Sequence, residues 1–428
     1  MEYKRIFKDG INLFSGKILT IVIGLINLMI LTRVLTTEDM GKYSLCLMIV
    51  NLGIQLGLNW SDTSIVRHGR EEFVKHKKIN KSFWARSILY VPLMVLFLCG
   101  YLIFTKQIAG YIGIAQSLVI LILFLFLLNG ITNSLSYIYM SIAQINRSSY
   151  ILPLQKLIYV GGLALFLLKV IPAKLGYVLI IINISFFLIL LYSILTFDYK
   201  YILPVKVNKV YLKKIWSFSW PQLIGFIGLY VINYADLFVI KKYLGFSNVG
   251  IYSVAYNCFT TITSILLTVN TLFMPLIVEY KCKKRQDLIT GYVRKIPLFA
   301  AAWIPIILIG LIFSKPIMIL VFSSKYLGSV APFRILLIST LFCVVSTFFL
   351  PLINAYDLII PLQSINVIKS IINVIVDLIL VPKIGIMGAA FGTMAAYFCE
   401  LILTGLLIFF KKDLFKGGEK ENDKKLFC

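Results

Sequence analysis

Histidine and acidic residues are scarce in this chain, and their scarcity excludes several kinds of chemistry. The 428 residues include 2 histidines and 18 Asp and Glu, against 42 Lys and Arg. Neither His68 nor His76 stands in an H-E-x-x-H motif, so a zinc-peptidase site is not expected. The sequence contains no G-x-x-x-x-G-K-[ST] phosphate loop and no glycine-rich dinucleotide turn. We therefore expect that the protein is not an enzyme and that it binds neither a metal ion nor an organic cofactor.

The 7 cysteines also argue against a stabilising framework of covalent or metal bonds. Their number is odd, and no C-x-x-C spacing occurs. This pattern predicts neither a disulfide scaffold nor a zinc site.

Charged residues make up only 14% of the chain, whereas hydrophobic residues make up 60%, and the mean hydropathy is +0.92. Such a composition is typical of a protein embedded in a lipid bilayer. The formal charge of +24 could suggest nucleic-acid binding. In a chain this apolar, we interpret it as loop charge that orients the helices, and expect no nucleic-acid partner.

Twelve apolar runs of about 20 residues predict an all-α integral membrane fold with twelve transmembrane helices. An even number of helices in each half makes the halves parallel repeats around a central cavity. We expect an N-terminal bundle at 1–198, a linker at 199–213, a C-terminal bundle at 214–411 and a basic tail at 412–428. The expected helices are 10–33, 40–60, 84–105, 113–140, 149–171, 174–198, 214–240, 247–275, 293–315, 331–353, 358–381 and 385–411.

The distribution of Lys and Arg predicts the orientation of these helices. If both termini are cytoplasmic, the inner segments hold 28 Lys and Arg and the outer segments hold 11. Positive charge concentrates on the cytoplasmic side of membrane proteins. We therefore expect both termini in the cytoplasm.

The chain also contains an internal repeat. Residues 33–44 (R-V-L-T-T-E-D-M-G-K-Y-S) return at 242–253 (K-Y-L-G-F-S-N-V-G-I-Y-S), so that Gly41 falls on Gly250. Gly176 and Gly385 keep the same spacing of 209 residues. A duplicated half in a membrane protein is typical of transporters whose site lies between two related halves.

Polar side chains inside apolar helices are costly and therefore indicate possible sites. The expected helix 358–381 carries Asn366, Lys369, Asn373 and Asp377 at spacings that place them on one face. Glu400 lies at nearly the depth of Lys369 on the next helix. Two compatible interpretations stay open: a structural Lys369–Glu400 ion pair, or a stripe that lines a water-filled cavity.

Other intramembrane polar residues add candidates for cargo binding and for ion coupling or gating. Lys17 and Lys156 could snorkel to the headgroups, or face inward and attract an anionic group. Asn27 and Asp236 are equivalent in the repeat and suit a gate or an ion site, although Lys241 or Lys242 could instead neutralise the carboxylate. The remaining candidates for a cavity are amides and a phenol, which could equally join helices to one another: Asn51, Gln55, Asn133 and Tyr137.

Three segments resemble the Wzx-type oligosaccharide flippases of the MOP superfamily. They are residues 33–43, residues 236–256 (D-L-F-V-I-K-K-Y-L-G-F-S-N-V-G-I-Y-S-V-A-Y) and residues 381–393 (V-P-K-I-G-I-M-G-A-A-F-G-T). The resemblance extends to length, helix number and the six-plus-six repeat. Its motifs are glycine-centred turns, which relatives with other cargo share.

This resemblance implies a multi-pass protein of the bacterial inner membrane that flips a polyprenyl-diphosphate-linked oligosaccharide for O-antigen or capsule assembly. It also implies alternating access, a cationic cavity to which Lys17 corresponds best, coupling to H⁺ or Na⁺, and polysaccharide polymerase and chain-length proteins as partners. The charged diphosphate cannot cross the hydrocarbon core of the bilayer without partners, and buried lysines would compensate its charge. The alternatives are a drug exporter of the same architecture, for which Asp236, Asp377 and Glu400 argue, and a membrane polymerase.

Overall fold

The fold is described from a computed structural model. It covers residues 2–283 and 285–411, and side chains are described from Asn12 onward except at 269–272, 275 and 282. The expected basic tail at 412–428 lies outside the described residues.

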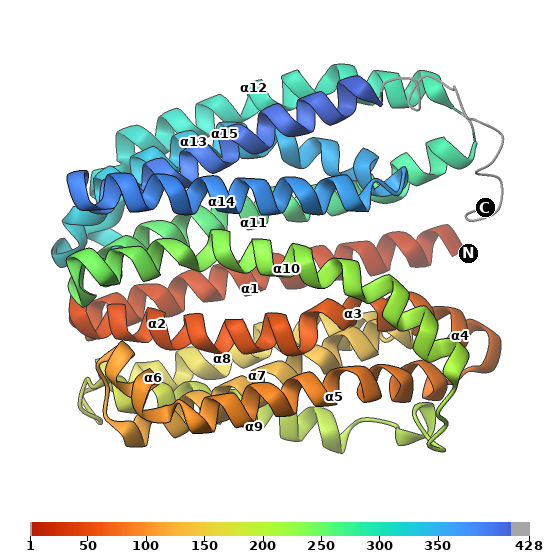
Figure 1. Ribbon diagram of the computed structural model, residues 1–428, viewed down its shortest axis with the longest axis horizontal. Helices are drawn as coiled ribbons and strands as arrows, with labels where there is room; N and C mark the ends of the chain where they lie inside the picture. The colour runs from red at the N-terminus through yellow and green to blue at the C-terminus, as the bar shows by residue number, and fades with distance from the viewer. Residues whose placement is uncertain (1, 284, 412–428) are drawn as a thin grey trace. The chain divides into compact units, whose positions relative to one another are not determined.

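Long helices account for nearly all of the described chain (Figure 1). Twelve of the described segments are long and apolar enough to cross a bilayer, so the prediction of an all-α membrane fold with twelve membrane-length helices is confirmed. The helices are α1 (Glu2–Val34), α2 (Thr37–Ile54), α3 (Trp60–Ser64), α4 (Arg70–His76), α5 (Asn80–Ile103), α6 (Thr105–Ile112), α7 (Gln116–Ser141), α8 (Ile145–Leu167), α9 (Leu175–Leu195), α10 (Lys209–Leu244), α11 (Phe246–Cys282), α12 (Gln286–Ile317), α13 (Val330–Ala355), α14 (Ile359–Ile384) and α15 (Ile386–Phe410), with short turns η1 (Gln55–Asn59), η2 (Ile65–Gly69), η3 (Tyr199–Tyr201), η4 (Met318–Phe322) and η5 (Ser324–Ser329).

The expected helix 40–60 continues much further than the sequence predicts. Two π-helical turns, η1 and η2, join α2, α3 and α4 into one run of 40 residues, Thr37–His76. The expected helix ends at residue 60, before Asp62. Instead, Asp62 is buried beside the Arg86 guanidinium, which satisfies its charge and lets the helix go on.

The chain divides into two compact units. The first unit comprises Met1–Tyr230 and Leu244–Ser253, and the second comprises Val231–Tyr243 and Val254–Cys428. Within the first unit, α1 packs along α8, and α7 packs against α2, α8 and α9. A buried cluster around Ile138, Tyr139 and Ile151 lies at the end of the first unit where α5 begins. There the Trp84 indole donates a hydrogen bond to the Ile202 carbonyl.

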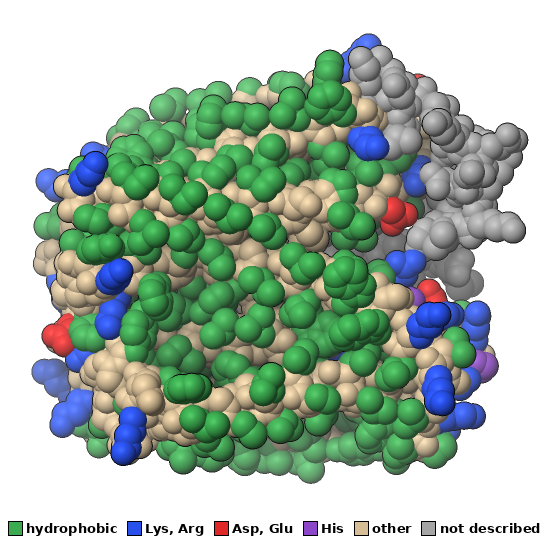
Figure 2. All heavy atoms as spheres, viewed as in Figure 1, with side chains coloured by type: hydrophobic (Ala, Val, Ile, Leu, Met, Phe, Trp, Pro, Cys, Tyr) green, Lys and Arg blue, Asp and Glu red, His purple; other side chains and the backbone are tan. Residues whose placement is uncertain are grey.

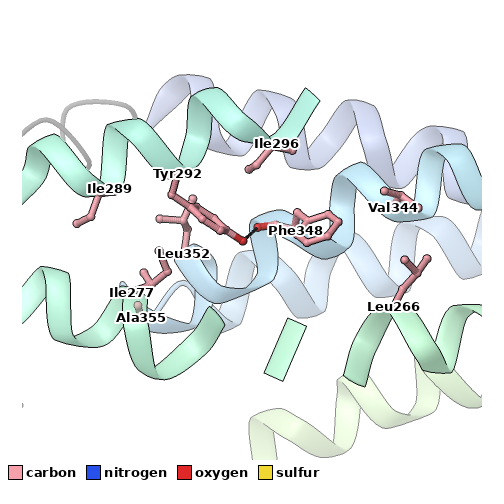
Figure 3. Close-up of a cluster of buried hydrophobic side chains, with 9 residues drawn as sticks. All are labelled: Leu266, Ile277, Ile289, Tyr292, Ile296, Val344, Phe348, Leu352 and Ala355. Carbon is pink, nitrogen blue, oxygen red and sulfur yellow. Dashed lines mark hydrogen bonds between the residues drawn. The ribbon is translucent and has the colours of Figure 1, made fainter. Parts of the chain in front are cut away.

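Within the second unit, α15 packs against both α13 and α14, and α13 packs against α12. Figure 3 shows a buried cluster of α11, α12 and α13, in which the Tyr292 hydroxyl donates a hydrogen bond of 2.7 Å to the Phe348 carbonyl. A tyrosine buried among apolar side chains needs such an acceptor, because an unpaired hydroxyl there is costly. This packing fixes α13 against α12, and α13 in turn contacts α15.

The visible surface has the pattern of a membrane protein. Hydrophobic side chains cover the middle of the helices in Figure 2, and Lys and Arg gather at the helix ends. An apolar belt with basic ends fits the dimensions and headgroup charge of a bilayer.

Candidate functional site

The polar stripe predicted on 358–381 lies on one buried face of α14. Asn366, Lys369, Asn373 and Asp377 are 7%, 4%, 0% and 0% exposed. Because α14 and α15 are in extensive contact within the second unit, this face meets polar groups of α15 and of α10 rather than lipid. The stripe thus supplies the second unit with a polar interior.

Asp236 of α10 is the centre of one cluster on this face. Asn373 Nδ2 donates to Asp236 Oδ1 over 3.0 Å, and Thr393 Oγ1 donates to Asp236 Oδ2 over 2.9 Å. The Asp377 carboxyl group lies close enough to Asp236 to interact with it directly. Two carboxyl groups that face each other in a buried site cannot both stay ionised without an added cation or a shared proton.

Asp377 is placed by a glycine on the neighbouring helix. A Cβ atom at Gly392 of α15 would collide with Asp377 Oδ1, so only glycine leaves room for the carboxylate. Neither carboxylate oxygen of Asp377 has a hydrogen-bond partner among the described residues, and Asn373 Oδ1 also lacks one. Buried polar atoms are almost always satisfied, so orphaned oxygens need an explanation.

These orphaned oxygens are chemically suited to a hard cation. Carboxylate, amide and hydroxyl oxygens are the ligands that such ions prefer, and Asp377, Asn373, Asp236 and Thr393 supply all three kinds. The described part of the chain has no group of three or more His, Cys, Asp or Glu side chains that could hold a metal ion. The arrangement can therefore take up either Na⁺ or a proton between the two carboxylates.

A second polar cluster lies on the same face of α14. Lys369 Nζ is 3.0 Å from Glu400 Oε2 of α15, which confirms the ion pair that their matching depth predicted. The ammonium group also lies 5.1 Å from the centre of the Tyr397 ring, a distance that suits a cation–π contact. The Glu400 side chain is 12% exposed, more than the 5% of Lys369, so the pair is accessible from the glutamate side.

The first unit contains a buried ion pair that the sequence analysis missed. Arg86 of α5 and Asp62 of α3 are 2% and 1% exposed and are in direct contact. Arg86 also donates to Ser61 Oγ over 3.1 Å and to Ser134 Oγ over 3.0 Å, and its guanidinium lies over the Tyr90 ring. Arg86 is one of the 28 Lys and Arg that the sequence analysis assigns to the inner segments. One feature of the sequence indicates a buried role: Arg86 lies inside the apolar run that begins at residue 84.

The two lysines predicted for a cavity in the first unit differ in their surroundings. Lys156 Nζ donates to the Thr20 carbonyl of α1 over 3.0 Å and occupies the space that a side chain at Gly24 would need. Lys17 is exposed on α1. Asn27, the repeat equivalent of Asp236, donates to the Lys156 carbonyl over 3.4 Å. Asn27 therefore joins α1 to α8. Its repeat equivalent Asp236 instead lies beside a second carboxyl group, that of Asp377.

The predicted polar residues of α2 and α7 mostly bond within their own helices. Asn51 Nδ2 donates to the Leu47 carbonyl over 2.8 Å, and Asn133 Nδ2 donates to Asn129 Oδ1 over 2.7 Å. Gln55 Oε1 is buried without a described partner at the first π turn. Tyr137 lies near Asp62 and Arg86.

The repeated segments contact each other directly. A Cβ atom on Gly41 would lie 3.0 Å from the Gly250 nitrogen, and one on Gly250 would lie 2.9 Å from the Gly41 nitrogen. Thr37 Oγ1 and Ser247 Oγ are 2.7 Å apart beside this crossing. The contact is reciprocal: each repeat copy packs its backbone against its equivalent, which only glycine permits at this distance.

Comparison with solved structures identifies the fold. An inward-facing multidrug-resistance MATE transporter of the MOP superfamily has a TM-score of 0.70 at 14% identity, covering 96% of this chain and 100% of that one. The lipid II flippase MurJ in an inward closed conformation has a TM-score of 0.68 at 15% identity, covering 95% and 87%. A MOP transporter of Pyrococcus furiosus has a TM-score of 0.66 at 14% identity, covering 96% of each chain. The fold is that of MOP-superfamily transporters.

Sequence comparison gives the family. Residues 6–281 match the family described as polysaccharide biosynthesis protein, and the chain belongs to it. An uncharacterised membrane protein of Methanocaldococcus jannaschii is 23% identical over 227 residues, which is 50% of this chain. The match covers 45% of that relative, so the chain spans about half the length of the curated relative it matches.

Proposed function

We propose that this protein flips a polyprenyl-diphosphate-linked oligosaccharide from the cytoplasmic to the outer leaflet, by alternating access coupled to H⁺ or Na⁺. The proposal includes Wzx-type O-antigen or capsule cargo, a bacterial inner membrane and cytoplasmic termini. It also includes two bundles, at 1–198 and 214–411, as the moving parts. Membership of the polysaccharide biosynthesis protein family and the fold shared with a lipid II flippase support a lipid-linked cargo.

One observation carries the coupling part of this proposal: the orphaned oxygens of Asp377 beside Asp236. Transport against a gradient needs a site whose occupancy changes during the cycle. A carboxylate pair with unsatisfied oxygens changes its interactions whenever a cation or proton arrives or leaves. Asn373 links this site to the stripe that carries Lys369, so ion binding and cargo binding would share one helix.

The cargo part rests on the lysines. Lys17, Lys156 and Lys369 would compensate the diphosphate as point charges, and Asn51, Gln55, Asn133, Tyr137 and Asn366 would bond the sugars. Lys17 is the most accessible of the three lysines. Polysaccharide polymerase and chain-length proteins would take over the cargo in the outer leaflet.

The decisive experiment follows the leaflet location of the lipid-linked oligosaccharide in cells that lack the protein. Restoring the wild type should return the oligosaccharide to the outer leaflet, and Asp377→Asn should not, although it preserves volume. Asp357→Asn is the matched control, because Asp357 is exposed in the same unit and adopts a left-handed conformation that asparagine tolerates. Full flipping by Asp377→Asn would reject the coupling site.

The same cells separate flipping from the alternatives. If the oligosaccharide reaches the outer leaflet without the protein but stays unpolymerised, a polymerase is the better assignment. If the oligosaccharide is unaffected, drug export becomes the leading function. The buried carboxylates Asp236 and Asp377, with Glu400, and the likeness to MATE transporters favour that second candidate. Collapsing the proton gradient or removing Na⁺ in turn identifies the coupling ion.

A further inference from the structure

One cavity of the first unit lies away from both clusters discussed above. It has a volume of about 460 Å³ and lies between the start of α2, the turn from α6 to α7 and the start of α9. Its lining residues are Asp39, Lys42, Gly113, Ile114, Leu118, Lys174, Leu175, Gly176, Tyr177 and Ile180. None of these residues was a candidate for cargo or ion binding.

Two lysines at the rim of this cavity differ in their interactions. Lys42 Nζ is 2.7 Å from Glu38 Oε1 and 5.4 Å from the centre of the Phe246 ring, and its side chain is 18% exposed. This ammonium is held in place at the rim. Lys174 is exposed and makes no ion pair or side-chain hydrogen bond with any described residue. The rim thus offers one fixed and one free ammonium group.

The acidic residue of the rim is already compensated. Asp39 lies in the first turn of α2, where a carboxylate is favoured by the helix N-terminus. It accepts a hydrogen bond of 3.1 Å from Thr36 Oγ1. Asp39 is thus held at the end of its own helix, and it forms no ion pair with Lys174 among the described residues.

The floor of the cavity is apolar and lies deeper in the membrane than the rim. Lys174 precedes the first residue of α9, and Ile180 lies six residues further along, about 9 Å at the helical rise. Leu118 and Ile114 face the same space from α7 and the turn before it. Because these are ends of membrane-length helices, the rim lies at headgroup level and the floor at the level of acyl chains.

We infer that this cavity binds a glycerophospholipid, with its phosphate at Lys42 and Lys174 and its glycerol and upper acyl chain over Ile114, Leu118 and Ile180. A soluble anion would leave the apolar floor in contact with water, whereas an uncharged lipid would leave Lys174 without a partner. A phospholipid suits both the rim and the floor, because its anionic phosphate would meet the lysines and its acyl chain would cover the apolar residues.

The test measures lipid binding to the purified full-length protein by native mass spectrometry. The probes are phosphatidylglycerol, a diacylglycerol with the same chains, and inorganic phosphate as a competitor. The wild type should bind phosphatidylglycerol more tightly than diacylglycerol, and inorganic phosphate should not displace it. Lys174→Ala should weaken binding about fivefold, and Lys42→Ala with Lys174→Ala about 25-fold, as expected for one and two lysines near a lipid surface.

Lys106→Ala is the matched control, because Lys106 is an exposed lysine of α6 outside the cavity lining. The proposal is overturned if Lys106→Ala weakens binding as much as Lys174→Ala, which would indicate diffuse surface charge. Equal binding of diacylglycerol would reduce the site to an apolar groove, and displacement by inorganic phosphate would make it a site for soluble anions. The Lys174 side chain makes no ion pair or hydrogen bond with the described residues, so its single variant remains informative if the double variant misfolds. The result does not depend on the cargo that the protein transports.

Discussion

Each unit of this protein buries a carboxylate on a membrane-length helix, but the two carboxylates are neutralised differently. Asp62 of the first unit has a guanidinium against it, supported by two serine hydroxyls. Asp377 of the second unit faces the Asp236 carboxyl group, and neither of its oxygens accepts a hydrogen bond from an amide, hydroxyl or cationic donor among the described residues. The guanidinium balances the charge of Asp62, although Asp62 Oδ2 has no hydrogen-bond partner among the described residues. The charge of Asp377 has only a second carboxyl group beside it, so a proton or a cation would be needed to balance it. This contrast is the reason that the proposed coupling site is assigned to Asp377 and not to Asp62.

The internal repeat shows where the two units differ. At the spacing of 209 residues, Arg86 falls on Lys295, which is exposed, so the second unit has no copy of the buried arginine. In the other direction, Asn373 falls on Ala164 and Asp377 on Leu168, both apolar. The two halves share turns and helices, but their buried charges are not duplicated. The proposed ion site therefore has no equivalent at the matching positions of the first unit.

Removing the guanidinium should have the largest effect on stability. Arg86→Met leaves the Asp62 carboxylate buried without its cation, which costs about 3–5 kcal/mol in the free energy of unfolding. Thermal unfolding of the purified protein in detergent measures the loss. Adding Asp62→Asn should restore part of it, because the unpaired charge is then gone. If Arg86→Met unfolds like the wild type, the pair is not structural.

The second prediction concerns the response of the other carboxylate to ions. If Asp236 and Asp377 bind Na⁺, the wild type should gain about 2.7 kcal/mol of stability at a Na⁺ concentration 100 times the dissociation constant. Asp377→Asn should lose this response while keeping its fold, because it removes a ligand charge and relieves carboxylate repulsion. Thermal unfolding in NaCl and in choline chloride measures it. A Na⁺ response that survives in the variant would place the ion elsewhere.

The sequence predicted the helices and the α14 stripe because both follow from periodicity. Lys369 and Glu400 could be paired from depth on consecutive helices. The neighbours of Asp236 could not be assigned in this way, because they depend on the packing of α10 against helices far along the chain. Arg86 was missed for a related reason. A basic residue near the end of an apolar run predicts orientation equally well whether it is exposed or buried, and only packing against Asp62 decides.

The glycine crossing tests whether the two repeats contribute equally to their contact. Gly41→Ala and Gly250→Ala each place a methyl group against backbone atoms, which cannot move aside as a side chain could. Each should cost about 1–3 kcal/mol, by a similar amount because the contacts are reciprocal. Thermal unfolding measures both, and the double variant should cost less than the sum, since one displacement accommodates both methyl groups. Gly57→Ala is the control, with no atom within 4 Å of the added methyl group, and its loss should be much smaller.

The smallest expected change in stability comes from the Lys369–Glu400 pair, which is also the pair with two open interpretations. Because Glu400 is partly accessible, Lys369→Ala should cost only about 1 kcal/mol of stability, yet it should reduce transport if the ammonium compensates a diphosphate. Exchanging the two residues, Lys369→Glu with Glu400→Lys, distinguishes the interpretations. A purely structural pair should tolerate the exchange and keep wild-type flipping in the leaflet assay. A cargo-binding lysine should not, because the exchange moves the positive charge from α14 to α15 and puts a carboxylate beside Tyr397.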